Sequence, residues 1–241
     1  ISGCDIVDNA ADWGGGLSCA HSVVAIRACR FEANVAAELG GGVRLVDCEG
    51  DLLQAVLLAN EAKSGGGMEV SDKAAIHVEN ALIADNTAVV YGAGVYLSGE
   101  ADAEFLYCTL SGNTANDDGG AIAAWGAEAV LAACIAWDNA PSNLLPLQGG
   151  MVAVTDSIVE GGWEGSGNRT TDPAFRLATE PYPYMLNWDS PAIDTATTDP
   201  PATDAQGAPR PQNAGPDLGA FEFGEDTDGG GLPDAYEWEH S

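Results

Sequence analysis

Residues 34–45 read NVAAELGGGVRL, an asparagine followed by a glycine cluster and an alternating apolar segment. The same order recurs along the chain. Asparagines stand at positions 9, 34, 60, 86, 113 and 139, at intervals of 25, 26, 26, 27 and 26 residues. Glycine clusters follow the first five of them, starting at residues 14, 40, 65, 92 and 119, and the sixth unit reaches Gly149-Gly150 after a longer gap. The sequence therefore contains six repeats of about 26 residues.

The length and pattern of one repeat predict a solenoid. A βαβ crossover needs about 30 residues or more, and the apolar residues here recur at every second position, as in Val43-Arg44-Leu45. Short strands separated by turns suit a coil in which each repeat forms one turn. Equivalent strands then stack in parallel about 4.8 Å apart. We expect an all-β fold, a right-handed single-stranded parallel β-helix of about six rungs with an irregular C-terminal cap.

Three apolar columns and one asparagine column follow from this register. The apolar columns are Ile6, Phe31, Leu57, Ile83 and Leu110; Leu17, Val43, Met68 and Val95; and Cys19, Leu45, Val70 and Leu97. They are predicted to form the core. The asparagines are predicted to stack at one turn, since an unpaired buried backbone group costs about 1–3 kcal/mol and asparagine tolerates the left-handed conformation of a tight turn. The alternative is an asparagine-lined binding site.

Two of these motifs resemble a known repeat family. Phe31-x-x-Asn34 and Gly119-Gly120-Ala121-Ile122 look like the paired motifs of polymorphic outer membrane protein repeats. More broadly, the chain is similar to pectin-lyase-like right-handed β-helix proteins. The other copies depart from the motif, because isoleucine or leucine replaces phenylalanine at positions 6, 57, 83 and 110. The resemblance implies the same fold as the repeat pattern.

The repeat ends near residue 156, and an ordered set of different motifs follows: residues 157–163, 172–175, 190–194, 204–210 and 217–222. This set resembles the terminal segment of secreted bacterial β-helix proteins that carry a surface anchor after it. We therefore divide the chain into β-helix rungs (1–160), a cap segment (161–223) and an acidic linker (224–241). Nine of the twelve prolines lie between Pro173 and Pro216, as expected for an irregular cap over the last rung. Its acidic residues are interpreted as turn and cap residues or as a metal or catalytic site: Asp194, Asp204, Asp217 and Glu222.

The last stretch has the spacing of a calcium loop. The predicted calcium ligands are Asp226, Asp228, Asp234 and Glu237, with the backbone carbonyl of Leu232. The loop resembles those of thrombospondin type 3 and dockerin-like repeats, except that Gly230 stands where a carboxylate is expected. The loss of one ligand predicts a dissociation constant of about 10⁻⁴–10⁻³ M or weaker. The alternative is an acidic glycine-rich linker.

The charge excludes several classes of partner. Acidic residues outnumber basic ones by 37 to 8, which gives a net charge of −29. Such a chain repels nucleic-acid phosphates and anionic lipid headgroups. No targeting signal is visible, and the apolar run of residues 121–137 is short for a membrane span and contains Glu128. An alternative origin of the charge is adaptation to high salt.

The six cysteines are informative by their register. Cys4, Cys29, Cys108 and Cys134 share one column, in which neighbours lie within disulfide range but with parallel Cβ vectors that strain the bond. Buried thiols are the alternative, and Cys19 and Cys48 are not assigned. No spacing of cysteine and histidine suggests zinc.

Catalytic patterns are sparse. Lyases of this fold use a basic residue, and Arg27, Arg30 and Arg44 are predicted to share one groove, although the negative surface opposes a polyanionic substrate. Asp117-Asp118 is the adjacent acidic pair that a hydrolase would need, with a solvated turn as the alternative. The histidines, at 21, 77 and 240, share no repeat position.

The sequence thus favours a non-catalytic, secreted or cell-surface protein, an adhesin or scaffold, with calcium at its C-terminus. Extracellular glycans or proteins are the expected partners. A carbohydrate-active enzyme, either a polysaccharide lyase or a glycoside hydrolase, is the alternative, because fold alone does not choose between them. Since residue 1 enters the repeat without a cap, we also expect further rungs upstream.

Overall fold

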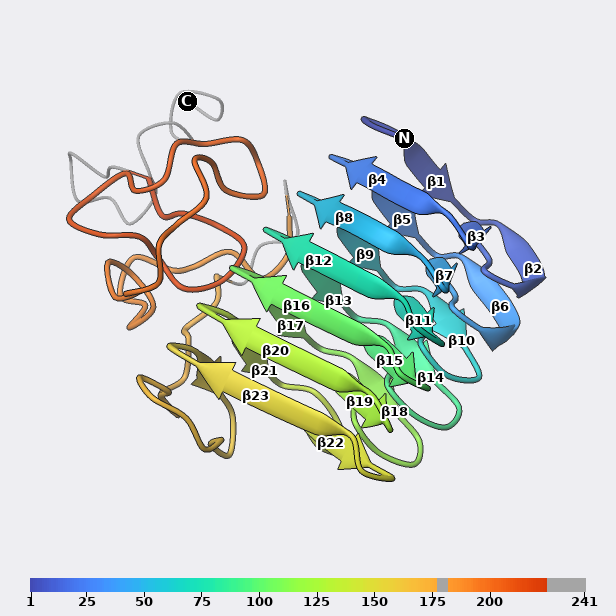
Figure 1. Ribbon diagram of the computed structural model, residues 1–241. Coiled ribbons are helices and arrows are strands. Elements are labelled where there is room, and N and C mark those ends of the chain that lie inside the picture. Colours follow the sequence, from blue (N-terminus) through green and yellow to red (C-terminus); the bar gives the residue numbers. More distant parts are fainter. Residues whose placement is uncertain (177–181, 225–241) are drawn as a thin grey trace.

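The computed structural model describes residues 1–176 and 182–224, which contain strands and irregular segments but no helix. The strands are short, between two and five residues long, and they form four parallel sheets along one coil (Figure 1). Each of the first five turns contributes one strand to every sheet, the sixth contributes to sheets 1, 3 and 4, and strands pair with the equivalent strand of the next turn. The predicted all-β parallel solenoid of about six turns is confirmed.

Sheets 1 and 2 begin each turn. Sheet 1 contains β1 (Asp5–Val7), β5 (Arg30–Glu32), β9 (Val56–Leu58), β13 (Leu82–Ala84), β17 (Thr109–Ser111), β21 (Ile135–Trp137) and β24 (Ile158–Val159). Sheet 2 contains β2 (Ala10–Trp13), β6 (Val35–Leu39), β10 (Glu61–Ala62), β14 (Thr87–Ala88) and β18 (Thr114–Ala115). The asparagine column lies at the corner between these two sheets.

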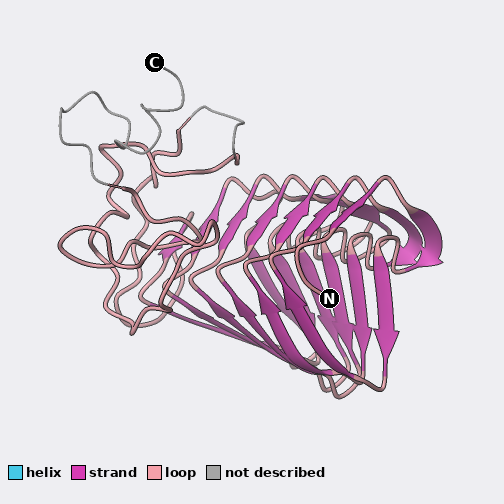
Figure 2. Cartoon of the chain, turned by 90° about the horizontal axis from the view of Figure 1, so that it is seen from above, coloured by secondary structure: helices cyan, strands magenta, loops and turns pink. Residues whose placement is uncertain are grey.

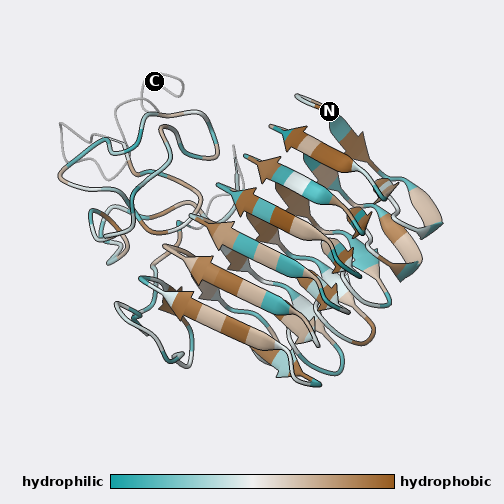
Figure 3. Ribbon diagram, viewed as in Figure 1, coloured by the Kyte–Doolittle hydropathy of each residue, from teal (hydrophilic) through white to brown (hydrophobic). Residues whose placement is uncertain are grey.

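Sheets 3 and 4 complete each turn. Sheet 3 contains β3 (Leu17–Ala20), β7 (Val43–Val46), β11 (Met68–Ser71), β15 (Val95–Ser98), β19 (Ile122–Trp125) and β22 (Leu144–Leu147). Sheet 4 contains β4 (Val23–Arg27), β8 (Glu49–Leu53), β12 (Ala75–Glu79), β16 (Asp102–Leu106), β20 (Glu128–Ala132) and β23 (Met151–Thr155). Hydropathy alternates along strands of sheet 4, such as β12 and β16 (Figure 3), as expected for strands with one buried face.

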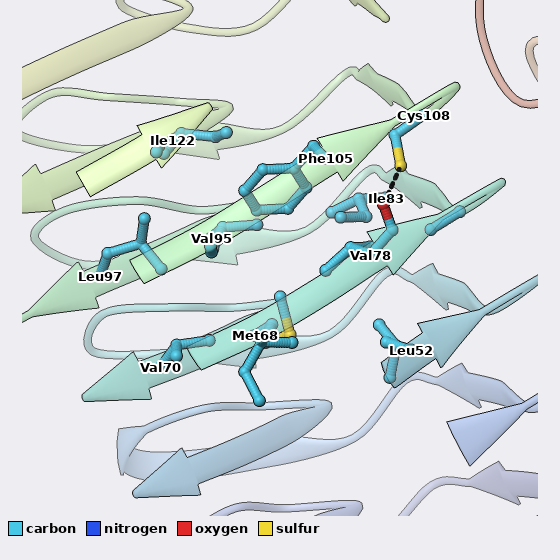
Figure 4. Packing of buried hydrophobic residues seen from close by; sticks show 14 of the residues in the cluster. Leu52, Met68, Val70, Val78, Ile83, Val95, Leu97, Phe105, Cys108 and Ile122 are labelled. Atoms are coloured by element: carbon cyan, nitrogen blue, oxygen red, sulfur yellow. Dashed lines mark hydrogen bonds between the residues drawn. The ribbon is translucent and has the colours of Figure 1, made fainter. Parts of the chain in front are cut away.

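The inward side chains form one continuous core. Phe31 pairs with Ile6 on one side and Leu57 on the other, and Val43 pairs with Leu17 and Met68, so the predicted columns are confirmed. Buried side chains from successive turns, including Leu52, Met68, Val95 and Phe105, face one another inside the coil (Figure 4). Burial of such side chains contributes about 1.5–3 kcal/mol each.

The six asparagines stack in single file. Nδ2 of each of the first five donates a hydrogen bond to Oδ1 of the asparagine one turn further on, over 2.8 to 3.0 Å. Each Oδ1 also accepts a bond from the backbone amide of the previous asparagine, as Asn86 does from Asn60 at 2.9 Å. The second hydrogen of Nδ2 reaches a backbone carbonyl, for example from Asn86 to Leu57. The predicted ladder is confirmed, and these bonds satisfy the backbone groups at the corner.

The left-handed residue of this corner stands one position before the asparagine, which corrects the prediction. Asp8, Ala33, Ala59, Asp85 and Asp138 have φ between 53 and 56°, and Gly112 has φ of 69°. With the turn made one residue earlier, the asparagine side chain is free to lie along the solenoid axis and bond to its neighbours.

The glycines that follow each asparagine make room for the ladder. A Cβ on Gly42 would lie 2.6 Å from the carbonyl oxygen of Gly67 and 3.1 Å from Nδ2 of Asn60. Gly16, Gly67 and Gly94 occupy the same close approach in their own turns. A side chain at these positions would therefore push successive turns apart.

The sixth turn differs from the prediction. Gly149-Gly150 does not continue the glycine column but lies between β22 and β23. Ser142 and Asn143 stand there instead, since their carbonyl oxygens accept bonds from the amides of Gly120 and Ala121. Asn143 also extends the ladder, because its Oδ1 accepts a bond from Nδ2 of Asn139 over 2.8 Å.

The C-terminal segment lies mainly on the side of the solenoid, where the sequence predicted a cap on its end. Residues 160–170 do close the last turn, where Trp163 packs against the core and donates to the carbonyl of Val152. Residues 182–224 lie beside the stack (Figures 1 and 2), against the outer face of sheet 1. That face is apolar, so it needs a cover. Outward residues of sheet 1 share buried clusters with residues of this segment: Val56, Leu82, Ile135 and Ile158 with Met185, Leu186, Leu218 and Phe221.

Candidate functional site

The outer face of sheet 3 carries the most unusual group of side chains in the described part of the chain. Arg44, Glu69 and Tyr96 occupy the same position in β7, β11 and β15 and pair in register. Their neighbours in each strand point into the core, so these three point outward. We name the outer-face band as Trp13, Arg44, Glu69, Tyr91, Tyr96 and Trp125.

Glu69 is buried although it lies on the outer face. Its side chain is 1% exposed, and Nε of Arg44 lies 3.4 Å from Oε2. Neither carboxylate oxygen, nor Nε of Arg44, has a hydrogen bond of normal geometry. Burial raises the pKa of Glu69, and the charge of Asp72 also raises it. A hydrogen bond with the Ser71 hydroxyl and the charge of Arg44 lower this pKa in part. The centre of the band thus holds three buried polar atoms whose contacts, to each other and to the Ser71 hydroxyl, fall short of good hydrogen-bond geometry.

Aromatic rings frame this polar centre. The Arg44 guanidinium lies 4.8 Å from the centroid of the Trp13 ring, and the rings of Tyr91 and Trp125 lie 6.2 Å apart. Trp13 and Trp125 are 46% and 38% exposed. The pKa of Tyr96 is raised by burial and by the nearby Glu69 and Tyr91, so its hydroxyl stays protonated at neutral pH. The band therefore presents apolar ring faces with hydrogen-bonding groups between them.

The solenoid brings these side chains together from five successive turns. Trp13 belongs to the first turn and Trp125 to the fifth, so the band extends about 19 Å along the axis, which is four steps of about 4.8 Å. The sequence contained the signal, since Arg44, Glu69 and Tyr96 are the middle residues of aligned apolar triplets. Neither Glu69 nor Tyr96 is among the site residues predicted from the sequence.

The predicted calcium ligands cannot be placed. Asp226, Asp228, Leu232, Asp234 and Glu237 fall within residues 225–241, outside the described residues. Within residues 1–176 and 182–224, no group of three or more histidine, cysteine, aspartate or glutamate side chains is arranged to hold a metal ion.

The four acidic residues of the C-terminal segment come together, as turn and cap residues. Asp217 accepts bonds from the amides of Asp194 and Phe223, over 2.7 and 2.6 Å, and Asp204 accepts bonds from the amides of Gln206, Ala208 and Glu222. Glu222 lies 3.3 Å from the buried Arg210 guanidinium, which stacks at 4.4 Å on the ring of Tyr107 in the solenoid. These acids therefore fold the segment and fasten it to sheet 1.

The buried Asp217 predicts a pH dependence of stability. Burial, together with the charge of Glu222, raises the pKa of Asp217 from 3.8 to about 7. A carboxyl with a raised pKa in the folded state contributes stability that is complete below its unfolded pKa and is lost as the pH rises through about 7. We expect this contribution to the unfolding free energy to fall between about pH 4 and about pH 7, the unfolded and folded pKa values, by up to about 1.4 kcal/mol per pH unit for one group. Urea unfolding at several pH values gives the unfolding free energy as a function of pH. This free energy should fall less steeply with pH in Asp217→Asn than in the wild type, and an equally steep fall would contradict the assignment.

Three other candidate groups do not form catalytic sites. Arg27, Arg30 and Arg44 lie in sheets 4, 1 and 3, so the predicted common groove is wrong. Asp118 accepts bonds from the Gly119 amide and the Ser142 hydroxyl, which is a turn role. The described histidines contact carboxylates on the surface: His21 contacts Asp47, and His77 contacts both Glu79 and Glu104.

The cysteines are free thiols. The backbone amide of Cys108 lies 3.4 Å from Sγ of Cys134, which places the two residues in adjacent turns of the predicted column. The thiol of Cys108 faces the carbonyl of Val78 at 3.5 Å (Figure 4). The sequence left two interpretations of this column, strained disulfide bonds or buried thiols, and the structure contains thiols.

Comparison of the chain with models of known families, with curated proteins and with solved structures finds no match. The fold itself defines the class, an all-parallel β-solenoid of about six turns. A helix that could cross a membrane does not occur in the described residues.

Proposed function

We propose that the protein is a secreted or cell-surface β-solenoid that binds extracellular glycans or proteins without catalysis. Its binding site would be the outer-face band. The observation that carries the proposal is the buried Glu69 carboxylate beside the partly exposed Arg44 guanidinium, between exposed aromatic rings; neither Glu69 oxygen, nor Arg44 Nε, has a hydrogen bond of good geometry. An unbonded buried polar atom costs about 1–3 kcal/mol, and a ligand that completes these bonds would offset that cost.

The scaffold suits recognition because the band rests on rigid elements. Its central residues stand on hydrogen-bonded strands, and the asparagine ladder fixes the spacing of the turns. A site held on strands loses little freedom when a ligand binds. The likeness of the C-terminal motifs to anchored bacterial surface proteins supports an extracellular location.

Loss of the two exposed tryptophans should weaken this binding. We expect the double variant Trp13→Ala/Trp125→Ala to bind at least about tenfold more weakly than the wild type, because each ring supplies apolar contact area. Arrays of extracellular glycans and matrix proteins would measure this. Trp188→Ala is the matched control, since Trp188 is 61% exposed on the C-terminal segment. If Trp13→Ala/Trp125→Ala binds as tightly as the control Trp188→Ala, the proposal is contradicted.

Calcium binding at the C-terminus is part of the proposed function. The spacing of Asp226, Asp228, Asp234 and Glu237 supports it, together with the Leu232 carbonyl. We expect calorimetric titration with calcium to give a dissociation constant of about 10⁻⁴–10⁻³ M or weaker and expect the heat to disappear in Asp226→Ala. Equal heats for the two proteins would refute the calcium site.

A glycoside hydrolase is the second candidate, favoured by one observation. Burial raises the pKa of Glu69, which is the state of a general acid in such enzymes. Asp72, whose charge acts on Glu69, is the nearest candidate for the second carboxylate that hydrolysis requires. A panel of polysaccharides, with and without calcium, separates the two functions: release of reducing ends that disappears in Glu69→Gln indicates the enzyme, and binding without release indicates the scaffold.

A further inference from the structure

We infer that the outer-face band binds a neutral, linear glycan whose chain lies along the solenoid axis, with neighbouring hydroxyls of one sugar unit bonded to Glu69 and Arg44 after the Arg44 side chain has moved away from Glu69. This inference rests on the proposed binding function and names its ligand. It follows from the chemistry of the polar centre, the arrangement of the rings and the spacing of the turns.

The polar centre selects hydroxyls. The two oxygens of Glu69 need donors, and Nε of Arg44, 3.4 Å away, needs an acceptor. A hydroxyl both donates and accepts, so two adjacent hydroxyls satisfy all three atoms. A ligand carboxylate would meet the charge of Glu69, and a ligand ammonium would meet the guanidinium. Uncharged sugars avoid both repulsions.

The aromatic rings of the band favour a flat ligand with apolar faces. Trp13, Tyr91 and Trp125 lie on both sides of the polar centre along the axis, and each offers surface to a sugar ring. The Arg44 side chain lies between Trp13 and Glu69, so a ligand reaches Glu69 by displacing Arg44. The guanidinium is held by one 3.4 Å contact and one ring contact and is partly exposed.

The spacing of the turns favours a glycan over a peptide. Successive turns are about 4.8 Å apart, close to the length of one sugar unit in an extended β-linked chain. A proline-rich peptide, which also binds aromatic surfaces, advances only about 3.1 Å per residue and would fall out of phase with the turns. The band covers four such steps, so about four sugar units should fill it.

Titration with three ligand types tests this inference. The probes are neutral β-1,4-linked glucose and mannose oligomers of increasing length, uronate oligomers of the same lengths, and a proline-rich peptide. We expect affinity for a neutral oligomer to rise up to about four units and then level off, with the other probes at least about tenfold weaker. Glu69→Gln and Tyr96→Phe should weaken binding about tenfold. The matched control Glu104→Gln, a surface carboxylate of sheet 4, should bind like the wild type.

The outcomes separate this inference from the proposed function. Band-dependent binding of a uronate or of the peptide, with weak neutral glycans, overturns the glycan inference and leaves the binding function in place. Binding of neutral glycans that Glu69→Gln and Tyr96→Phe do not change also overturns the inference. Two negative results together overturn both the glycan inference and the proposed binding function. They are that no probe binds in the titrations and that Trp13→Ala/Trp125→Ala binds the arrays as well as the wild type does. Urea unfolding of each variant shows that it is folded, and Tyr96→Phe, which removes one oxygen, keeps the test valid if Glu69→Gln does not fold.

Discussion

Asn86→Ala is expected to lower the free energy of unfolding by about 3–5 kcal/mol. The Asn86 side chain is fully buried and makes four hydrogen bonds, to Leu57 and Asn113 as donor and from the backbone and side chain of Asn60 as acceptor. Alanine would leave these partners buried and unpaired, in the middle of the solenoid. Equilibrium unfolding in urea measures the loss.

The matched control for this variant is Asn9→Ala. Asn9 has the same position in the repeat, but it is exposed and donates to Asn34 at the first turn of the ladder. Water can replace the bonds lost there, so we expect a change below about 1 kcal/mol. Equal losses in the two variants would show that position in the ladder does not determine its contribution.

Gly42→Ala is expected to destabilise the protein by about 3 kcal/mol or more. The added Cβ would lie 2.6 Å from the Gly67 carbonyl oxygen, a backbone atom that no side-chain rotation can move away. Two turns would have to separate, which would stretch the ladder bond between Asn34 and Asn60, now 3.0 Å.

Gly3→Ala serves as the control for the glycine prediction. Gly3 has φ of 58° and no atom within 4 Å of its added Cβ, so alanine should cost only the strain of the left-handed conformation, about 1–2 kcal/mol. Thermal unfolding of both variants would make the comparison. A Gly42→Ala protein as stable as Gly3→Ala would mean that the turns are not in contact at the ladder.

The repeat was predictable because its residues do the same task in every turn. Asn60 and Gly42 recur at fixed intervals, and Val43 and Leu45 alternate with Arg44, so register, core and ladder all follow from spacing. Each of these roles depends on contacts between neighbouring turns, which the period of the sequence encodes.

Features that depend on contacts outside the period were not predictable. The glycine pair at 149–150 looks like a sixth cluster, but Ser142 and Asn143 fill that position, and Asn143 adds a bond to the ladder by accepting from Asn139. The side position of the C-terminal segment depends on the apolar outer face of sheet 1. Val56 and Leu82 in that face are indistinguishable from core residues in sequence.

The outer-face band combines a feature that the repeat predicts with one that it does not. Its register follows from the repeat, because Arg44, Glu69 and Tyr96 are aligned in sequence. The burial of Glu69 does not, since it depends on how side chains from neighbouring turns pack around one carboxylate. Trp13 and Tyr91 join the band from the segments that lead into sheet 3, where the repeat varies in length.

All of these conclusions require that the chain rises by one strand spacing for every repeat, and a distance along the axis tests that most directly. Val23 and Met151 are exposed in one row of sheet 4, linked through Glu49, Ala75, Asp102 and Glu128. Spin labels at Val23→Cys and Met151→Cys, with Cys4 and Cys19 replaced by alanine, report their separation by double electron–electron resonance. We expect a narrow distribution near 24 Å, five steps of about 4.8 Å. A broad distribution, or a narrow one centred far from that value, would contradict the solenoid and the site built on it.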